Sequence, residues 1–267
     1  MKSPLKMMLL AVLLAGGAQA QMFQHKYGFA SSLGSHTRNG EVTSSTGPGH
    51  LIGGTHVTNT AAMLPDYGIY VLRTDIDGRL NTVNEFNRSY VLSHGVSGYQ
   101  LRITKGMVVE FSDGSGYGAV GSNVTQSGFM QPYREQGIAY VRLDLQGNVM
   151  NVQGYSFGDN SGYMSMLMGI KESVSKPGDM FVTGMVYPPG DDTTMWVMRI
   201  DQAGTLAWGK TFNFNVGGEK PVDLAENPVQ TNQLVVLGDY DNPSASFHRG
   251  FWMTLDENTG TLTGLWA

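Results

Sequence analysis

The chain has 267 residues, a formal net charge of −5, 36 glycines and no cysteine. The lack of cysteine excludes disulfides, thiolate metal sites and cysteine nucleophiles, and a negative chain without clusters of Lys and Arg argues against nucleic acid as a partner. With 41% hydrophobic residues and so many glycines, the composition favours an ordinary core with frequent turns and excludes collagen-like and disordered chains.

The N-terminus has the pattern of a cleavable secretory signal peptide. Two lysines precede an unbroken apolar stretch over residues 7–15, which is too short to cross a bilayer and is followed by Ala18 and Ala20. An uncleaved anchor or a buried first helix is the alternative, but glycines end the apolar run too early for a span. We expect residues 1–20 to be the signal peptide and residues 21–267 to be one secreted domain, extracellular or periplasmic. No later run approaches the ~18 apolar residues of a membrane-spanning helix.

One pattern recurs four times after this segment. A short apolar strand with an aromatic residue runs into Asp, and Gly follows three or four positions later. Asp accepts hydrogen bonds from the backbone of a turn and Gly supplies a positive φ, so each copy predicts a hairpin between two strands. The copies span residues 70–78, 139–147, 196–204 and 251–260. We expect the four turns on one face, with matching strand positions for Arg73, Arg142, Arg199 and Thr254.

Further strands flank each copy. A strand that ends near Gly lies upstream, at residues 51–54, 117–121, 181–184 and 234–238. A strand with aromatic residues follows downstream, around residues 86–90, 155, 208–212 and 262–266. A further strand is expected before each Gly strand, at residues 41–45, 100–111, 165–172 and 221–229. Units of roughly 50 to 70 residues with four strands each predict an all-β fold, a β-propeller of about four four-stranded blades.

Two alternatives to a closed four-bladed ring remain: a β-sandwich, and a part of a larger propeller that a second copy completes. The aromatic segment at residues 23–27 resembles the last strand of a unit, so it could complete the final blade or cover its edge. We also expect Trp196 and Trp252, at matching or adjacent positions in the third strand, to pack between neighbouring sheets.

The third unit resembles a known repeat. Trp208-Gly-Lys-Thr-Phe212 places aromatic residues around a lysine, and the strand from Trp196 closes on Asp-x-x-Gly204. In these features the chain resembles the short propeller repeats of secreted bacterial proteins, the delta-60 and SBBP-like repeats. The first and second units lack the Trp, and the second also lacks the first aromatic residue of its last strand. The resemblance implies blades and an exported setting, and it implies no single activity.

The motifs that could carry chemistry are incomplete. Residues 116–121 fit G-x-G-x-x-G, but a loop follows where dinucleotide binding requires a helix N-terminus. Asp75 and Asp77 could begin a calcium loop, but Arg79 fills a ligand position, so a turn is the better interpretation. Residues 158–162 only loosely resemble a serine-nucleophile loop, and the six histidines lack metal-ligand spacing. We therefore expect no cofactor and no metal, and we assign no catalytic residue.

In a propeller, the connections from second to third strand reach the face opposite the hairpins. These four segments are long, and each carries an aromatic residue beside charged ones, which suits stacking and hydrogen bonding to a sugar or peptide. The candidate ligand-binding residues are Asp66, Tyr67, Tyr133, Arg134, Tyr187, Asp191, Asp192, Tyr240, Asp241, His248 and Arg249.

The first functional hypothesis is an exported, non-catalytic binding or scaffold propeller that binds an extracellular glycan or protein. An extracellular hydrolase or lyase acting on glycan or peptide is the alternative, and a structural component of an envelope assembly is a third. The loop groups suited to acid–base work are Asp66, Asp191, Asp192, Asp241 and His248. A close pair of carboxylates in one pocket would favour the enzyme. Solvated loops without a ligand are the remaining interpretation, and a homo-oligomer is compatible with any of these.

Overall fold

The computed structural model describes residues 35–37, 42–43, 49–59, 66–80, 87–90, 102–125, 134–156, 164–187, 193–214, 218–241 and 248–266. The predicted signal peptide and the aromatic segment at residues 23–27 lie outside these ranges. The described chain is all-β and forms four antiparallel sheets, which are four propeller blades.

Each sheet follows the chain from its first to its last strand, except that one short strand of the first sheet lies off this path. The first sheet contains β1 (Ser35–Thr37), β2 (Val42–Thr43), β3 (His50–Asn59), β4 (Asp66–Thr74) and β5 (Asn87–Tyr90). The second contains β6 (Arg102–Glu110), β7 (Tyr117–Thr125), β8 (Arg134–Leu143) and β9 (Val149–Ser156). The third contains β10 (Met164–Glu172), β11 (Met180–Tyr187), β12 (Thr194–Ile200) and β13 (Leu206–Phe212). The fourth contains β14 (Glu219–Glu226), β15 (Gln233–Asp241), β16 (His248–Asp256) and β17 (Leu262–Trp266).

The four predicted hairpins are confirmed. Gly78, Gly147, Gly204 and Gly260 have φ between 68° and 80°, the left-handed region that Gly adopts without strain. In the second hairpin, the Asp144 carboxylate accepts hydrogen bonds from the backbone N–H groups of Gln146 and Asn148, at 2.9 and 2.7 Å. The Asp75 carboxylate accepts from Asp77 and Arg79 in the same way, which agrees with a turn at this position. We call the end of the sheets that carries these turns the hairpin end and the opposite end the loop end.

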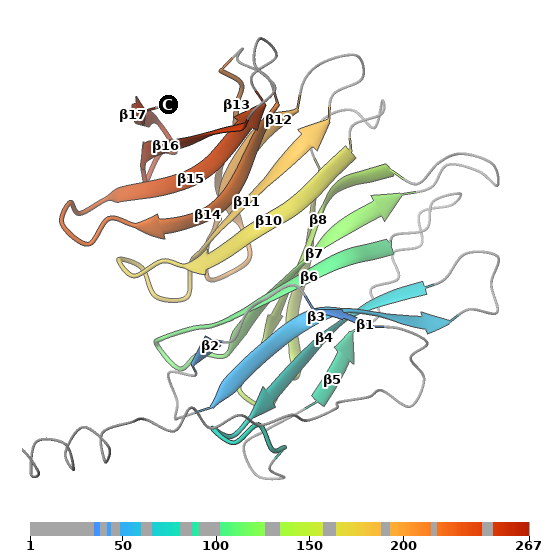
Figure 1. Ribbon diagram of the computed structural model, residues 1–267. Helices are drawn as coiled ribbons and strands as arrows, with labels where there is room; N and C mark the ends of the chain where they lie inside the picture. Colours follow the sequence, from blue (N-terminus) through green and yellow to red (C-terminus); the bar gives the residue numbers. More distant parts are fainter. Residues whose placement is uncertain are drawn as a thin grey trace, which may run out of the picture.

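The sheets stack in chain order. Figure 1 shows the first sheet at the bottom and the fourth at the top, with the second and third between them. Strands β3 and β4 pack on β6, β10 packs on β6 and β8, and β14 packs on β10 and β11. Among the described strands, no pair from the first and fourth sheets packs to this extent. The described blades therefore form an arc with two terminal sheets.

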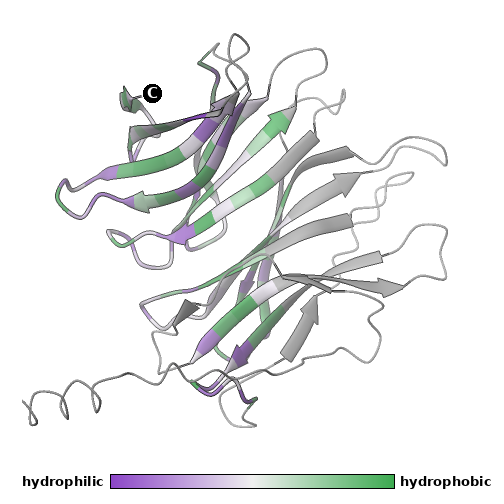
Figure 2. Cartoon of the chain, in the orientation of Figure 1, coloured by the Kyte–Doolittle hydropathy of each residue, from purple (hydrophilic) through white to green (hydrophobic). Residues whose placement is uncertain are grey.

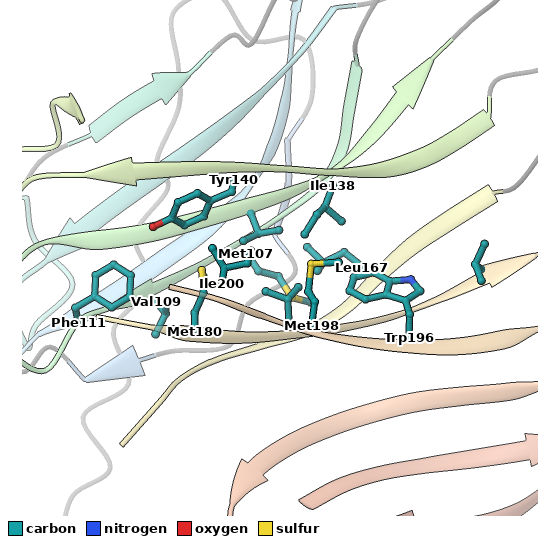
Figure 3. Close-up of a cluster of buried hydrophobic side chains, with 13 residues drawn as sticks. Met107, Val109, Phe111, Ile138, Tyr140, Leu167, Met180, Trp196, Met198 and Ile200 are labelled. Carbon is teal, nitrogen blue, oxygen red and sulfur yellow. The ribbon is translucent and has the colours of Figure 1, made fainter. Parts of the chain in front are cut away.

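Three apolar cores fill the spaces between neighbouring sheets. Leu51 and Val71 of the first sheet pack with Tyr117 and Val141 of the second. The core between the second and third sheets includes Met107, Tyr140, Met198 and Trp196, which Figure 3 shows interleaved between the facing strands. The third core joins Phe181, Val197 and Trp208 to Leu234, Phe251 and Met253 of the fourth sheet. Blades are held to blades by burial of this kind.

The residue pattern agrees with this arrangement. In Figure 2, apolar stretches lie along the described strands and hydrophilic residues gather toward strand ends that lead into turns. In the described part of the chain, no helix is long and apolar enough to cross a membrane.

Trp196 and Trp252, which were both predicted to pack between sheets, lie in opposite environments. Trp196 pairs with Gly184 and is completely buried, which confirms its expected position between sheets. In the fourth sheet, the residue paired with the equivalent Gly238 is Phe251, and Trp252 follows it. Because neighbouring residues of a strand face opposite sides, this offset of one residue places Trp252 on the outer face of the fourth sheet. It is 41% exposed, so the prediction of packing between sheets is wrong for Trp252.

Candidate functional site

The predicted loop-end residues lie mostly on strands. Tyr133, Asp191 and Asp192 lie outside the described residues. The others extend the strand ladders beyond the apolar segments: Asp66 and Tyr67 begin β4, Arg134 begins β8, Tyr187 ends β11, Tyr240 and Asp241 end β15, and His248 and Arg249 begin β16. The register pairs Asp66 with Asn59, Arg134 with Thr125, and Asp241 with His248. The sheets thus bring these residues to the loop end as strand termini rather than as free loop positions.

Tyr240 differs most from its predicted environment. Its side chain is only 6% exposed and belongs to the core between the third and fourth sheets, with its ring centroid 6.5 Å from that of Phe251. The strand continues through Asp241, and Tyr240 has the same parity as Val236, which faces the third sheet. Arg249, its register partner, is exposed. The ring of Tyr240 therefore contributes to packing, whereas Arg249 is exposed.

The hairpin end carries an arginine contact that links the second sheet to the third and recurs between the third and the fourth. The predicted equivalence of one position in the third strand of each unit is confirmed. In each sheet this position lies three residues after the residue that pairs with the glycine of the preceding strand, and it is occupied by Arg73, Arg142, Arg199 and Thr254. Arg142 of the second sheet donates to the Gly178 carbonyl of the third at 3.1 Å. Arg199 of the third sheet donates to the Glu257 carbonyl of the fourth at 3.0 Å and to the Asp179 carboxylate at 2.7 Å. Both arginines are buried, so these contacts fix one blade against the next.

A glutamate at the end of the first strand makes the reverse contact. Glu172 of the third sheet accepts the backbone N–H of Ser112 in the second sheet at 2.8 Å. Glu226 of the fourth sheet accepts the N–H of Val174 and the hydroxyl of Ser173 in the third, at 2.6 and 2.8 Å. A carboxylate that accepts several backbone N–H groups is held in one orientation. The arginines and glutamates together form what we call the blade clamps.

Glu226 and Glu257 form a close carboxyl pair at the hairpin end of the fourth sheet. Burial, together with the hydrogen bond to Glu226 and the repulsion of its charge, raises the pKa of Glu257 above its usual value. A raised carboxyl pKa is typical of a catalytic acid. Here, however, Glu257 is only 1% exposed, it accepts the hydroxyl of Ser175, and the oxygens of Glu226 are occupied by a neighbouring turn. The pair is therefore suited to joining blades, since Glu257 is buried and both oxygens of Glu226 accept hydrogen bonds from the turn of the third sheet.

The fourth sheet lacks the clamp residues on its outer face. In the third sheet, Arg199 is the register partner of Trp208. At the equivalent positions of the fourth sheet, Thr254 is the register partner of Gly264. Trp208 donates its indole N–H to the Glu257 carbonyl of the next sheet at 2.8 Å, a contact that Gly264 cannot make. Arg199 and Trp208, the two side chains of the third sheet that contact the next sheet, are thus replaced by small residues in the fourth.

An exposed apolar row occupies this outer face instead. Leu237, Trp252 and Trp266 are register partners on three adjacent strands and are 50%, 41% and 46% exposed. The two indole rings stack with centroids 3.8 Å apart and planes within 9°. The side chain of Trp266 lies over Gly264, where a Cβ would meet the ring at 2.2 Å. We call these three residues the outer aromatic row.

Sequence reasoning missed the glutamates and the outer aromatic row. The glutamates were visible as Glu110, Glu172 and Glu226, each the last residue of the first strand of its sheet. The row could have been found from the one-residue offset between Trp196 and Trp252 relative to the strand glycines. In the described part of the chain, no group of three or more His, Cys, Asp and Glu residues could hold a metal ion.

Comparisons with known proteins find partial structural similarity to solved structures. No protein-family model and no curated protein sequence matches the chain. A solved structure titled as a GH43 β-1,3-galactosidase is similar in part, with a TM-score of 0.42 and 9% sequence identity. The match covers 82% of this chain and 43% of that one, so the chain spans less than half of the neighbour's length.

Proposed function

We propose that this protein is an exported, non-catalytic binding propeller. The observation that carries the proposal is that carboxylates at the hairpin end already accept hydrogen bonds from the protein itself. Glu172, Glu226 and Asp179 accept them from backbone N–H groups or from a buried arginine. The turn aspartates accept backbone N–H groups in the same way. Acid–base catalysis needs a carboxyl group that can exchange a proton with a substrate, and these groups support the fold instead.

The ligand in this proposal is held at the exposed ends of the blades. At the loop end, the exposed Arg249 and the strand-terminal residues Tyr187, Asp66 and Arg134 supply the charged and aromatic chemistry for a glycan or a protein segment. Tyr240 has no part in it because its ring is buried.

The test compares binding with turnover. The full chain is incubated with soluble glucan, xylan and glycol chitin and with casein, and both binding and product size are measured. We expect binding to at least one of these probes and no shortening of any of them. The double variant Tyr187→Ala, Arg249→Ala should weaken binding at the loop end by about tenfold. The matched control Asp201→Asn alters a hairpin turn and should change stability while leaving affinity unchanged.

Two results would contradict the proposal. Shortened polysaccharide or peptide, abolished by Glu257→Gln or Glu226→Gln, would make the chain a hydrolase whose acids lie at the hairpin end. If the chain binds none of the four probes, the structural role in an assembly becomes the better hypothesis.

A further inference from the structure

At the hairpin end, two carboxyl groups of the fourth sheet converge on one turn of the third. Glu226 is the last residue of β14, and it accepts hydrogen bonds from the Ser173 hydroxyl at 2.8 Å and the Val174 N–H at 2.6 Å. Glu257 directly follows β16, and its carboxyl group accepts a hydrogen bond from the Ser175 hydroxyl at 2.5 Å. Two elements of the fourth sheet are therefore held against three consecutive residues of the third. We call this contact the third–fourth joint.

The backbone of Glu257 carries the rest of the joint. Its carbonyl accepts hydrogen bonds from the Arg199 guanidinium at 3.0 Å and from the Trp208 indole N–H at 2.8 Å, both in the third sheet. Its N–H donates to the Asn232 carbonyl, in the turn that joins β14 to β15, at 3.0 Å. The main chain and the side chain of one residue thus tie the two sheets together. A movement of Glu257 would therefore be felt at the indole of Trp208.

The joint between the second and third sheets has the same layout with a different pair of side chains. Gln202 follows the turn aspartate of the third sheet, as Glu257 does in the fourth, and its amide donates to the Asp113 carboxylate of the second sheet at 3.3 Å. Asp113 lies three residues after the end of its first strand, as Ser175 does in the third sheet. Gln202 and Asp113 are both exposed, whereas Glu257 is buried beside Glu226. The third–fourth joint thus replaces an exposed amide with a buried acid.

The charges around this carboxyl pair do not balance two negative groups. The Arg199 guanidinium is bound to the Asp179 carboxylate at 2.7 Å, so its charge is already paired. Lys176 is exposed, and its Nζ atom donates to the side-chain oxygen of Asn258 at 3.0 Å. The Asp256 carboxylate adds a further negative charge and accepts backbone N–H groups of its own turn. One proton held by the pair removes the repulsion between its two carboxyl groups.

We infer that the third–fourth joint is a pH-sensitive device, closed while Glu226 and Glu257 hold one proton between them and loosened locally when both are ionised. The movement separates the turn after β16 from residues 173–175, while the apolar core between the two sheets stays packed. In the loosened joint, the indole N–H of Trp208 loses the Glu257 carbonyl and exchanges with water. The inference holds for a binding protein and for an enzyme, so it does not rest on the proposed function.

The direction of the pH effect follows from the state that holds the proton more tightly. In the closed joint, burial and the neighbouring Glu226 raise the pKa of Glu257. In the loosened joint, this pKa returns toward its ordinary value of about 4.3. Loosening should therefore be least at or below the ordinary value, grow as pH rises, and level off above the raised pKa of the closed joint.

The test is hydrogen exchange of the indole N–H groups of the full chain, followed by NMR from about pH 4 to pH 9. The four tryptophans give four indole signals, and Trp208→Phe identifies that of Trp208. Trp196, buried between the second and third sheets, is the internal reference. Dividing the exchange rate of Trp208 by that of Trp196 at the same pH removes the ordinary dependence of exchange on pH. We expect this ratio to rise severalfold with pH and then to level off.

Three variants make the test specific to the carboxyl pair. Glu257→Gln keeps the shape of the side chain without its charge, so the ratio should stay at its low value across the range. The Ser175 hydroxyl favours the ionised form of Glu257, so in Ser175→Ala the rise should continue to a higher pH. Asp256→Asn is the matched control, because it removes the adjacent carboxylate of the same turn and should leave the rise in place.

A constant ratio in the native chain would overturn the inference, even if the Trp208 signal shifted with pH, because the pair would then titrate in a joint that stays closed. An equal rise in Glu257→Gln would overturn it as well, since another group would be responsible. If Glu257→Gln does not fold, Ser175→Ala decides the matter: a rise that ends at a lower pH than in the native chain would contradict the assignment to Glu257.

Discussion

The third and fourth sheets show how one repeat serves an inner and a terminal blade. The third sheet has neighbours on both faces: Trp196 is buried toward the second sheet, and Arg199 reaches the fourth. The fourth sheet has a described neighbour on one face only. Its inner face keeps the apolar pattern with Phe251 and Met253, but its outer face has Thr254 and Gly264 where the third sheet has Arg199 and Trp208. The repeated sequence pattern thus specifies the four strands of a blade. The residues at the positions of Arg199 and Trp208 determine whether another sheet packs on its outer face.

The first and largest expected effect separates the two tryptophans. Trp196→Ala should lower the free energy of unfolding by about 3–5 kcal/mol, because it leaves a cavity between two sheets. Trp252→Ala should cost less than about 1 kcal/mol, because its ring is half in solvent. Urea denaturation of both variants measures the difference. Equal losses would mean that the outer face of the fourth sheet is covered like the inner one.

The second effect concerns the clamp position. Arg199→Ala should lower the free energy of unfolding by about 3 kcal/mol, because the Asp179 carboxylate loses its buried cationic donor and the Glu257 carbonyl keeps only the Trp208 indole N–H. In the matched variant Thr254→Ala, the hydroxyl that accepts a hydrogen bond from Thr263 is lost, which should cost about 1 kcal/mol. The two variants are compared by the same denaturation. A cost for Thr254→Ala as large as that for Arg199→Ala would show that the outer face holds another element.

The third and smallest effect is a pH dependence in the turn of the fourth sheet. The pKa of Glu257 is raised in the folded state by burial and by Glu226, so the folded chain binds this proton more tightly than the unfolded chain. Its contribution to stability therefore falls as pH rises from the ordinary Glu pKa of about 4.3 through the folded value. Glu257→Gln should flatten the stability profile in that window.

Asp256, the neighbouring residue, provides a control of opposite sign. Hydrogen bonds from the Thr259 hydroxyl and from backbone N–H groups lower the pKa of Asp256. Its contribution is present above the ordinary Asp pKa and is lost as pH falls through the folded value. Asp256→Asn should remove stability at neutral pH and leave the Glu257 window unchanged. An unaltered profile in Glu257→Gln would show that this residue is not protonated in the folded chain.

The comparison also explains which features could be predicted from sequence. Hairpins are local, so Asp201 and Gly204 determine their turn whatever packs around it, and all four copies were recognised. The clamps depend on contacts between blades, so Arg199 was placed in register while its partners Asp179 and Glu257 were not foreseen. Trp252 was misplaced because a shift of one residue along a strand reverses the face.

The candidate site was less predictable than the fold. The loop-end residues were assumed to follow the strands, but β15 continues through Asp241 and turns Tyr240 into the core. Aromatic composition favoured a binding surface there, and periodicity could not show which rings face solvent. The outer aromatic row depends on a register between β16 and β17 that only the folded sheet reveals.

The most direct test of the open outer face is iodide quenching of tryptophan fluorescence. The chain has four tryptophans, of which Trp196 and Trp208 are buried and Trp252 and Trp266 are exposed. We expect two emitting populations in the native chain, one quenched and one shielded, and the loss of the quenched one in the double variant Trp252→Phe, Trp266→Phe. A single shielded population in the native chain would contradict it, because the fourth sheet would then be covered on both faces.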